Sequence, residues 1–319
     1  MKDHKTSVAD LVGRDQTGLK ATGDVVTILE CHEHMKQCKS FETGPAGIVL
    51  IQNYDLTKNY RTTQAAFADI SDLFQILKTV SACDRKAIIR GEPTFDIRET
   101  GYRPKTKNPQ PVRVKGIPAL NADRNLVTEP PTYKDAPRRW HVIDADNIGS
   151  EFWQGLDLIQ DAERIARRFR AGLPEWLRGT AMIVQLSSSH GVEHYVVPTD
   201  PDGNVGEPEL KTAKPKLHLF YLTDRALTAD QGDLLAKEIG TDPAPARTVQ
   251  HVYTATPAFF DTKNNSVADP LGRERWFLLD GDAHATLPGP SAAMWEHKSG
   301  IGGGKRHFRT FTSTGLTKF

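Results

Sequence analysis

The 319-residue chain has few cysteines, no long apolar segment and almost no net charge. Its three cysteines are too few for a disulfide framework, so we expect a reducing, cytoplasmic location. No apolar run approaches the roughly 20 residues that cross a bilayer, and the polar N-terminus has no signal-peptide core. We therefore expect no membrane partner. The 41 Lys and Arg residues nearly balance the 40 Asp and Glu residues, so the overall electrostatic field of the chain is weak. A polyanion would therefore have to be held by a local basic patch.

Two widespread catalytic signatures are also missing. The sequence contains no Gly-x-x-x-x-Gly-Lys-Ser/Thr loop, which argues against a P-loop ATPase, and no Gly-x-Ser-x-Gly elbow, which argues against a serine hydrolase of that type. What the chain does contain is an ordinary proportion of hydrophobic residues, 38%, and enough length for a sizeable core. Its composition is typical of a globular protein.

Apolar runs and helical periodicity alternate along the chain. The spacing of apolar residues predicts a helix over 63–80 and a long helix over 150–169. Thr228 and Gln231 have the spacing of a capping box that opens a third helix, and Gly240 ends it. Strands are expected at residues 47–52, 86–90, 140–143, 181–186, 216–221, 250–254 and 275–279. This order predicts an α+β fold built on an open sheet.

An acidic pair follows one of these strands. Asp144 and Asp146 come directly after the apolar run 140–143, and alternate residues of a strand share a face, so their carboxylates should emerge on one side. Carboxylate oxygens suit Mg²⁺ and Mn²⁺, and such a pair with a third acid can hold metals at a phosphoryl-transfer centre. A solvated turn is the alternative interpretation. Asp280 and Asp282 follow another strand, but the glycine between them favours a turn, so we favour the first pair.

Groups suited to an anion follow one strand and begin another. They are Ser187, Ser188, Ser189 and His190 after the first strand, and Lys216 and His218 in the second. Hydroxyls and exposed amide N–H groups at a strand end can bind phosphate oxygens, and alternate positions put the lysine and the histidine on one face. The structural alternatives, a serine-rich turn and a partly buried histidine, stay open at this point.

Arginine pairs flank the acidic residues in sequence. Arg138 and Arg139 precede them, and Arg167 and Arg168 lie in the basic end of the helix expected over 150–169. Each pair alone is normally a solvated face. Around an acidic centre, however, such clusters are typical of a track for nucleic acid.

Zinc is the competing metal hypothesis. Cys31, His32, Glu33, His34 and Cys38 could supply ligands within a short segment. No second closely spaced ligand pair follows at the distance typical of zinc fingers, so we do not favour a structural zinc site.

Six segments carry a resemblance to a known family. In chain order they are 142–146, 187–191, 216–220, 223–228, Asp242 after a helix, and 250–257. This ordered set resembles the motifs of the archaeo-eukaryotic primase superfamily, which are an apolar strand ending in Asp-x-Asp, a Ser-x-His element and a later single Asp. It is most similar to the primase-polymerases (PrimPol) of phages, plasmids and integrated elements, over roughly residues 120–290.

The resemblance implies an archaeo-eukaryotic primase fold, in which an RRM-like sheet bears the catalytic acids beside a smaller α/β unit. It also implies a template-dependent nucleotidyltransferase that acts as DNA primase and DNA polymerase in the replication of a mobile genetic element. Asp144, Asp146 and Asp242 would be its catalytic, metal-binding acids and would hold two Mg²⁺ or Mn²⁺ ions.

The same resemblance implies nucleotide-binding residues and partners. The phosphates of a nucleoside triphosphate would be held by Ser187, Ser188, Ser189, Lys216 and a histidine. Between His190 and His218 we slightly favour His218, because it is nearer to Asp242 in sequence. Single-stranded DNA as template or primer and a helicase domain or another replication protein would be the partners.

Three parts of the chain follow from the resemblance. Residues 1–125 would form the N-terminal α/β part of the primase-polymerase module, residues 126–290 the RRM-like catalytic part, and residues 291–319 a basic, Gly-rich tail of the kind that leads into a further domain.

Two alternative functions stay open. A nucleotide-sugar glycosyltransferase also places Asp-x-Asp after an apolar strand to hold Mn²⁺, but it would leave the segment 250–257 without a role. A non-catalytic replication-initiation protein would bind DNA without needing the acids.

Overall fold

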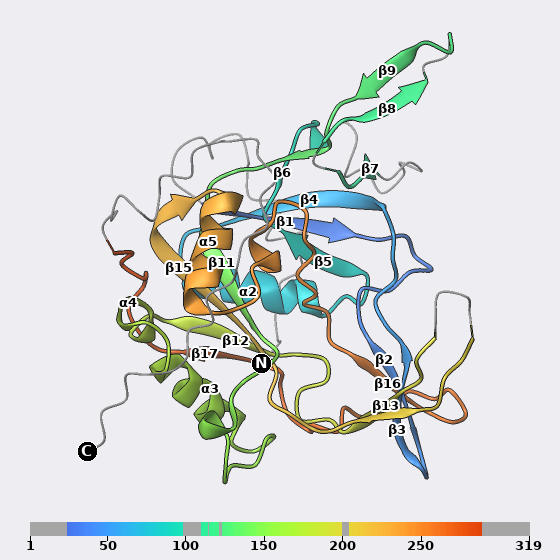
Figure 1. Cartoon of the computed structure of the whole chain (residues 1–319), viewed down its shortest axis with the longest axis vertical. Helices are drawn as coiled ribbons and strands as arrows, with labels where there is room; N and C mark the ends of the chain where they lie inside the picture. The colour runs from blue at the N-terminus through green and yellow to red at the C-terminus, as the bar shows by residue number, and fades with distance from the viewer. Residues whose placement is uncertain (1–23, 98–109, 114, 121–122, 200–203, 289–319) are drawn as a thin grey trace, which may run out of the picture. The chain divides into compact units, whose positions relative to one another are not determined.

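The computed structural model describes residues 24–97, 110–113, 115–120, 123–199 and 204–288 (Figure 1). All of them belong to the first of two units into which the chain divides, Met1–Pro288 and Gly289–Phe319, so the predicted basic tail lies outside the described residues. The fold is mixed α+β, with many strands and few helices. Its α-helices are α2 (Ile70–Ser81), α3 (Ala162–Ala171), α4 (Glu175–Arg178) and α5 (Ala229–Ile239). Within the described residues, no helix combines the length and the apolar character needed to cross a membrane.

A four-stranded antiparallel sheet carries one of the predicted acids, Asp144, and one predicted histidine, His218. Its strands lie in the order β11 (Arg138–Ala145), β15 (Leu217–Leu227), β12 (Met182–Leu186) and β17 (Trp276–Leu279). Because each neighbour is antiparallel, the end of β11 meets the start of β15 and the end of β12 at one edge. There Asp144 lies opposite His218, which lies opposite Gln185.

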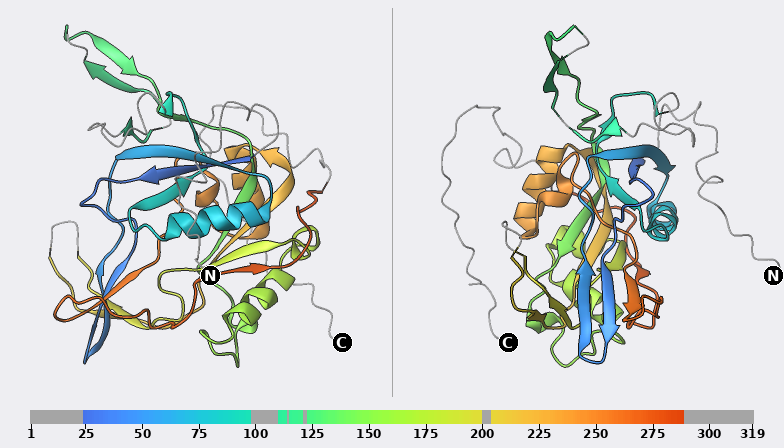
Figure 2. Two further views of the ribbon diagram at one scale, coloured as in Figure 1. Left: turned by 180° about the vertical axis from the view of Figure 1, so that it is seen from behind. Right: turned by 90° about the vertical axis from the view of Figure 1, so that its right-hand side faces the viewer.

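Each face of this sheet packs against a separate layer. On one face Trp140, Phe220 and Ile183 join the core of α2 and of a second sheet, β5 (Lys86–Ile89), β1 (Asp24–Glu30), β4 (Asn59–Phe67) and β7 (Gln110–Pro111). On the other face Ile143 and Leu219 pack with α3 and α4. Figure 2 shows α2 and α5 on opposite sides of the central sheet. Because both faces of the sheet are covered, the residues of β11 at positions 140–143 are all buried.

The third sheet joins segments that are far apart in sequence. Its strand order is β14 (Glu209–Lys211), β13 (His194–Val196), β3 (Gly47–Gln52), β2 (Ser40–Gly44) and β16 (Ala258–Asp261). Strands from both sides of residue 125 therefore share one sheet. The small pair β6 (Glu92–Pro93) and β10 (Tyr133–Lys134) and the hairpin β8 (Ile117–Leu120) and β9 (Leu126–Glu129) complete the strands, and the hairpin projects from its neighbours (Figure 1).

The prediction for α5 is confirmed in detail. The Thr228 side chain accepts from the Gln231 backbone N–H, and the Gln231 side chain accepts from the Thr228 N–H. Gly240 ends the helix with φ of 80°, a left-handed conformation that glycine adopts without strain.

Two helix predictions were wrong in their extent. The segment 63–80 is divided: β4 runs to Phe67 because it pairs with β1 along its length, and the Asp69 side chain then caps α2. The long helix over 150–169 is a short 3₁₀ turn, η3 (Ser150–Phe152), followed by α3. Gly155 has φ of 74° between them, which a continuous helix does not allow.

The strand expected at 250–254 is also corrected. It is reduced to a single bridge between Ile88 and Val252, next to the central core. The remaining strand predictions correspond to β3, β5, β11, β12, β15 and β17.

Candidate functional site

The three predicted acids line one cavity of about 210 Å³ at the edge of the central sheet. Asp144 is the penultimate residue of β11 and Asp146 follows the strand, so both point to the same side. Asp242 comes two residues after the cap that ends α5. Its Oδ1 accepts from the Ala244 N–H at 2.8 Å, which anchors it at the start of a 3₁₀ turn, η4 (Ala244–Ala246).

His218 is fixed beside Asp144 by a row of side chains across the sheet. The Gln185 amide nitrogen donates to the Thr254 carbonyl at 2.9 Å, so its oxygen faces His218 Nδ1, 2.8 Å away. Nδ1 therefore donates to Gln185, and Nε2 points toward Asp144 Oδ1 at 3.5 Å. That separation is too long for a strong hydrogen bond, and the buried Oδ1 accepts none from the described residues.

Three cationic or imidazole groups surround the acids. Burial raises the pKa of Asp144, but the neighbouring His218, Lys216 and Lys39 outweigh it, and the net pKa is lowered. Lys216 Nζ lies 3.8 Å from Asp146 Oδ1. Burial lowers the pKa of Lys39, and the like charge of Lys216 lowers it further against the opposing effect of both acids. The cavity is therefore negative at the acids and positive beside them.

Two residues that the sequence did not single out complete this cavity. Lys39 precedes β2, and Tyr54 lies in the loop after β3. The Tyr54 ring stacks on that of Tyr253, with centroids 3.7 Å apart and planes 4° from parallel, and its hydroxyl hydrogen-bonds to Ser188. Tyr253 lies in the segment 250–257 that carried the resemblance, but no sequence signal marks Lys39 or Tyr54.

The predicted anion-binding residues divide into two groups. Ser187, Lys216 and His218 line the cavity, whereas Ser188, Ser189 and His190 do not. His190 is fully buried, its Nε2 lies 2.8 Å from the Leu158 carbonyl, and its Nδ1 accepts from the Lys216 N–H at 3.1 Å. Burial also lowers its pKa. His190 thus has both ring nitrogens bonded to backbone, and His218 is the histidine that faces the acids.

A second cavity, of about 540 Å³, shares the acids with the first. Asp144, Asp146 and Asp242 line both. The first cavity is also lined by Val142 and the second by Ala145, and these two residues point to opposite faces of β11. The acids therefore lie at the sheet edge between two cavities that open on opposite faces.

The predicted DNA-binding arginines have different environments. Arg138 is buried, its Nε donates to the Arg90 carbonyl, and burial lowers its pKa, so it does not present charge at the surface. Arg139 lies 3.8 Å from Asp24. Arg167 pairs with Glu163 one helical turn away at 2.7 Å, and the half-buried Arg168 lies beside it on α3.

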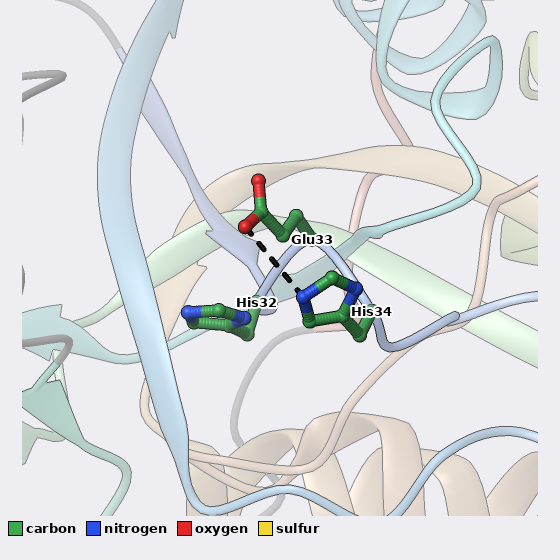
Figure 3. A group of neighbouring side chains, drawn as sticks. All are labelled: His32, Glu33 and His34. Atoms are coloured by element: carbon green, nitrogen blue, oxygen red, sulfur yellow. Dashed lines mark ion pairs between the residues drawn. The ribbon is translucent and has the colours of Figure 1, made fainter.

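The most compact group of candidate metal ligands is elsewhere. Among the described residues, the group whose ligand atoms all lie within 4.8 Å of each other is His32, Glu33 and His34, on an exposed turn after β1 (Figure 3). Asp144, Asp146 and Asp242 are more widely spaced. Cys31 and Cys38 do not join the exposed group, and burial raises the pKa of each thiol to about 11, which disfavours the zinc hypothesis.

The three acids nevertheless have the donor chemistry of a magnesium or manganese site. Their donors are all carboxylate oxygens, and the buried Asp144 Oδ1 has a lone pair free.

The competing pair, Asp280 and Asp282, lies away from this site. It follows β17 at the opposite edge of the sheet, where the Asp280 carbonyl accepts from Arg170.

Comparison of the chain with protein-family models, with curated proteins and with solved structures finds no match. The interpretation of the site therefore depends on its own geometry and chemistry.

Proposed function

We propose that the chain is a template-dependent nucleotidyltransferase, a DNA primase and polymerase of the archaeo-eukaryotic primase type. One observation carries the proposal: Asp144, Asp146 and Asp242 line the same cavity as Lys39, Lys216 and His218. Transfer of a nucleotide from a triphosphate requires carboxylates for divalent ions and cationic groups for phosphate oxygens, side by side.

Each residue has a chemical role in this proposal. The three acids would hold two Mg²⁺ or Mn²⁺ ions, which when bound supply Lewis-acid stabilisation of the reacting oxygens. Lys39 and Lys216 would bind the β- and γ-phosphates, and Ser187 would donate a hydroxyl hydrogen bond. His218, held by Gln185, would place Nε2 toward the phosphates and the acids.

The mixed α+β fold is compatible with the same class. The central sheet β11-β15-β12-β17 would be the RRM-like sheet, with the acids at its edge, and the sheet β5-β1-β4-β7 with α2 would be the accompanying α/β unit. In this proposal single-stranded DNA is the template, the replicating DNA belongs to a mobile element, and a helicase or another replication protein acts together with the chain.

The glycosyltransferase alternative explains less of the site. An Asp-x-Asp pair and one diphosphate-binding lysine would satisfy it, leaving Asp242 and the second cavity without a role. A non-catalytic DNA-binding protein would not need carboxylates and ammonium groups in one cavity.

The experiment is an incorporation assay on single-stranded DNA with labelled nucleotides and Mg²⁺ or Mn²⁺, with and without a primer. We expect metal-dependent incorporation that is lost in Asp144→Ala/Asp146→Ala. The matched control is Asp280→Ala/Asp282→Ala, an identical change in the other Asp-x-Asp, which should retain activity. Equal incorporation by both double variants, or none by the wild type, would contradict the proposal.

A further inference from the structure

The two cavities that share the acids differ in the rest of their lining. The first contains Lys39, Lys216 and His218. The second contains none of Lys, Arg or His among its lining residues, which besides the acids are Ala145, Asn147, Phe152, Phe169, Gly172, Leu173, Ile239, Gly240 and Thr241. A polyanion such as a triphosphate therefore suits the first cavity. The second suits a flat, largely uncharged group.

Nucleotidyl transfer brings two reactants to one set of acids. The 3′-oxygen of the acceptor forms a bond to the α-phosphorus, the bond from that phosphorus to the bridging oxygen breaks, pyrophosphate leaves, and the hydroxyl proton is released. In-line attack requires the acceptor and the leaving group on opposite sides of the phosphorus. Two cavities on opposite faces of one sheet edge provide that separation.

We propose that the second cavity binds the acceptor nucleoside, the one that carries the attacking 3′-hydroxyl, and that its base stacks on Phe152. The inference rests on the proposed function. Its volume of about 540 Å³ falls within the range of roughly 300–1,000 Å³ typical of small-molecule sites.

The two aromatic rings that line this cavity, Phe152 and Phe169, pack against each other. Phe152 from η3 and Phe169 from α3 meet edge to face, with centroids 5.6 Å apart and planes at 76°. Such a contact fixes the orientation of the Phe152 ring. A fixed aromatic face is a sequence-tolerant platform for a base, as a template-directed enzyme needs for an acceptor end of any sequence.

Gly172 allows the Phe152 ring to pack directly against the backbone at the end of α3. Its φ of −81° is one that any residue adopts, so the backbone does not require glycine there. A Cβ at this position would lie 2.7 Å from Phe152 Cε1 and 2.8 Å from Cζ. An alanine would therefore displace the ring, which gives a second way to disturb the platform without touching the acids.

The test measures the KM for the primer and the KM for the nucleotide separately. In primed extension, Phe152→Ala and Gly172→Ala should each raise the KM for the primer by roughly 10-fold or more and leave the KM for the nucleotide near the wild-type value. Phe152→Tyr, which keeps the ring, should restore primer KM. Phe260→Ala, on β16 and in the lining of neither cavity, is the matched control and should change neither constant.

A spectroscopic readout does not depend on turnover. A primer with 2-aminopurine at its 3′ end should lose fluorescence on binding the wild type without nucleotide, because the base stacks, and should keep it with Phe152→Ala. Unchanged primer KM and unchanged quenching in a folded Phe152→Ala would overturn the assignment while wild-type incorporation leaves the proposed function standing. If the wild type incorporates no nucleotide with either metal, the proposed function fails and this inference falls with it.

Discussion

Gln185 Oε1 lies 2.8 Å from His218 Nδ1, on the strand next to it. The other end of the same amide is held by the Thr254 carbonyl, so the amide cannot turn over without losing a bond. The contact fixes which nitrogen of His218 faces Asp144. A neutral glutamine inside a buried strand thereby acts as a positioning residue for the site.

Gln185→Leu should test this positioning role. The change leaves the Thr254 carbonyl and His218 Nδ1 without their partner, which costs roughly 1–3 kcal/mol of unfolding free energy per unsatisfied group. We expect kcat to fall by about 10-fold or more, by analogy with residues that orient the histidines of metal sites. Gln185→Glu keeps an acceptor for Nδ1 and should recover part of kcat. Equal kcat in Gln185→Leu and the wild type would show that His218 needs no orientation.

The two histidines should respond to substitution in opposite ways. His190→Ala removes a buried ring whose nitrogens bond to Leu158 and Lys216, so we expect a loss of roughly 2 kcal/mol or more of unfolding free energy and a nearly normal nucleotide KM in the folded protein. His218→Ala should cost little stability and should reduce kcat/KM strongly. Urea unfolding and steady-state kinetics on both variants measure the two effects, and the reverse pattern would refute the assignment.

Local patterns predicted only part of this arrangement. Alternation along a strand was sufficient to place Asp144 with Asp146 and Lys216 with His218, and the capping box fixed α5, because both depend on neighbours in sequence. The pairing that sets Asp144 opposite His218 was not predicted. The division of the segment 63–80 depends on the pairing of β4 with β1, which no local pattern contains. The helix expected over 150–169 is interrupted at Gly155. This glycine is evident in the sequence, but glycine also occurs within helices, so its presence alone did not predict the interruption.

The rest of the site is assembled from segments distant in the chain. Lys39 and Tyr54 come from the N-terminal third, and a single lysine or tyrosine in a loop carries no signal of what it will face. The chemical role of Gln185 depends on Thr254, 69 residues away. Asp242 was indicated by the order of motifs, not by its surroundings in the sequence.

Lys216 and Lys39 should govern nucleotide affinity. Each places an ammonium group in the first cavity, and charge-assisted hydrogen bonds to phosphate contribute about 1.5–3 kcal/mol. Lys216→Ala and Lys39→Ala should therefore raise the nucleotide KM by roughly 10-fold or more. Lys211→Ala is the matched control, because Lys211 is exposed on β14 and pairs with Glu209. A nucleotide KM that rises equally in all three variants would indicate a general charge effect.

His251 should make stability depend on pH. It lines the first cavity, its Nε2 is buried without a hydrogen-bond partner among the described residues, and burial lowers its pKa from 6.5 to about 4. Between these two pKa values the His251 imidazole is protonated in the unfolded chain and neutral in the folded chain. The free energy of unfolding therefore falls as the pH drops from 6.5 toward 4.

The matching variant is His251→Gln, which does not titrate. Urea unfolding at pH 7 and at pH 5 should show a larger loss of unfolding free energy in the wild type than in this variant. An identical loss in both would mean that His251 is protonated with similar ease in the folded and unfolded chains.

Divalent-ion binding tests the central role of the acids most directly. Mn²⁺ bound to the protein can be counted by electron paramagnetic resonance with a non-hydrolysable nucleoside triphosphate present. The exposed ligand group is removed in all samples by His32→Ala/His34→Ala, because it could take up an ion of its own. We expect two nucleotide-dependent ions, which are lost in Asp144→Asn/Asp146→Asn, reduced in Asp242→Asn and retained in Asp280→Asn/Asp282→Asn. The same number of bound ions in these three variants and in the His32→Ala/His34→Ala parent protein would contradict the assignment of the three acids.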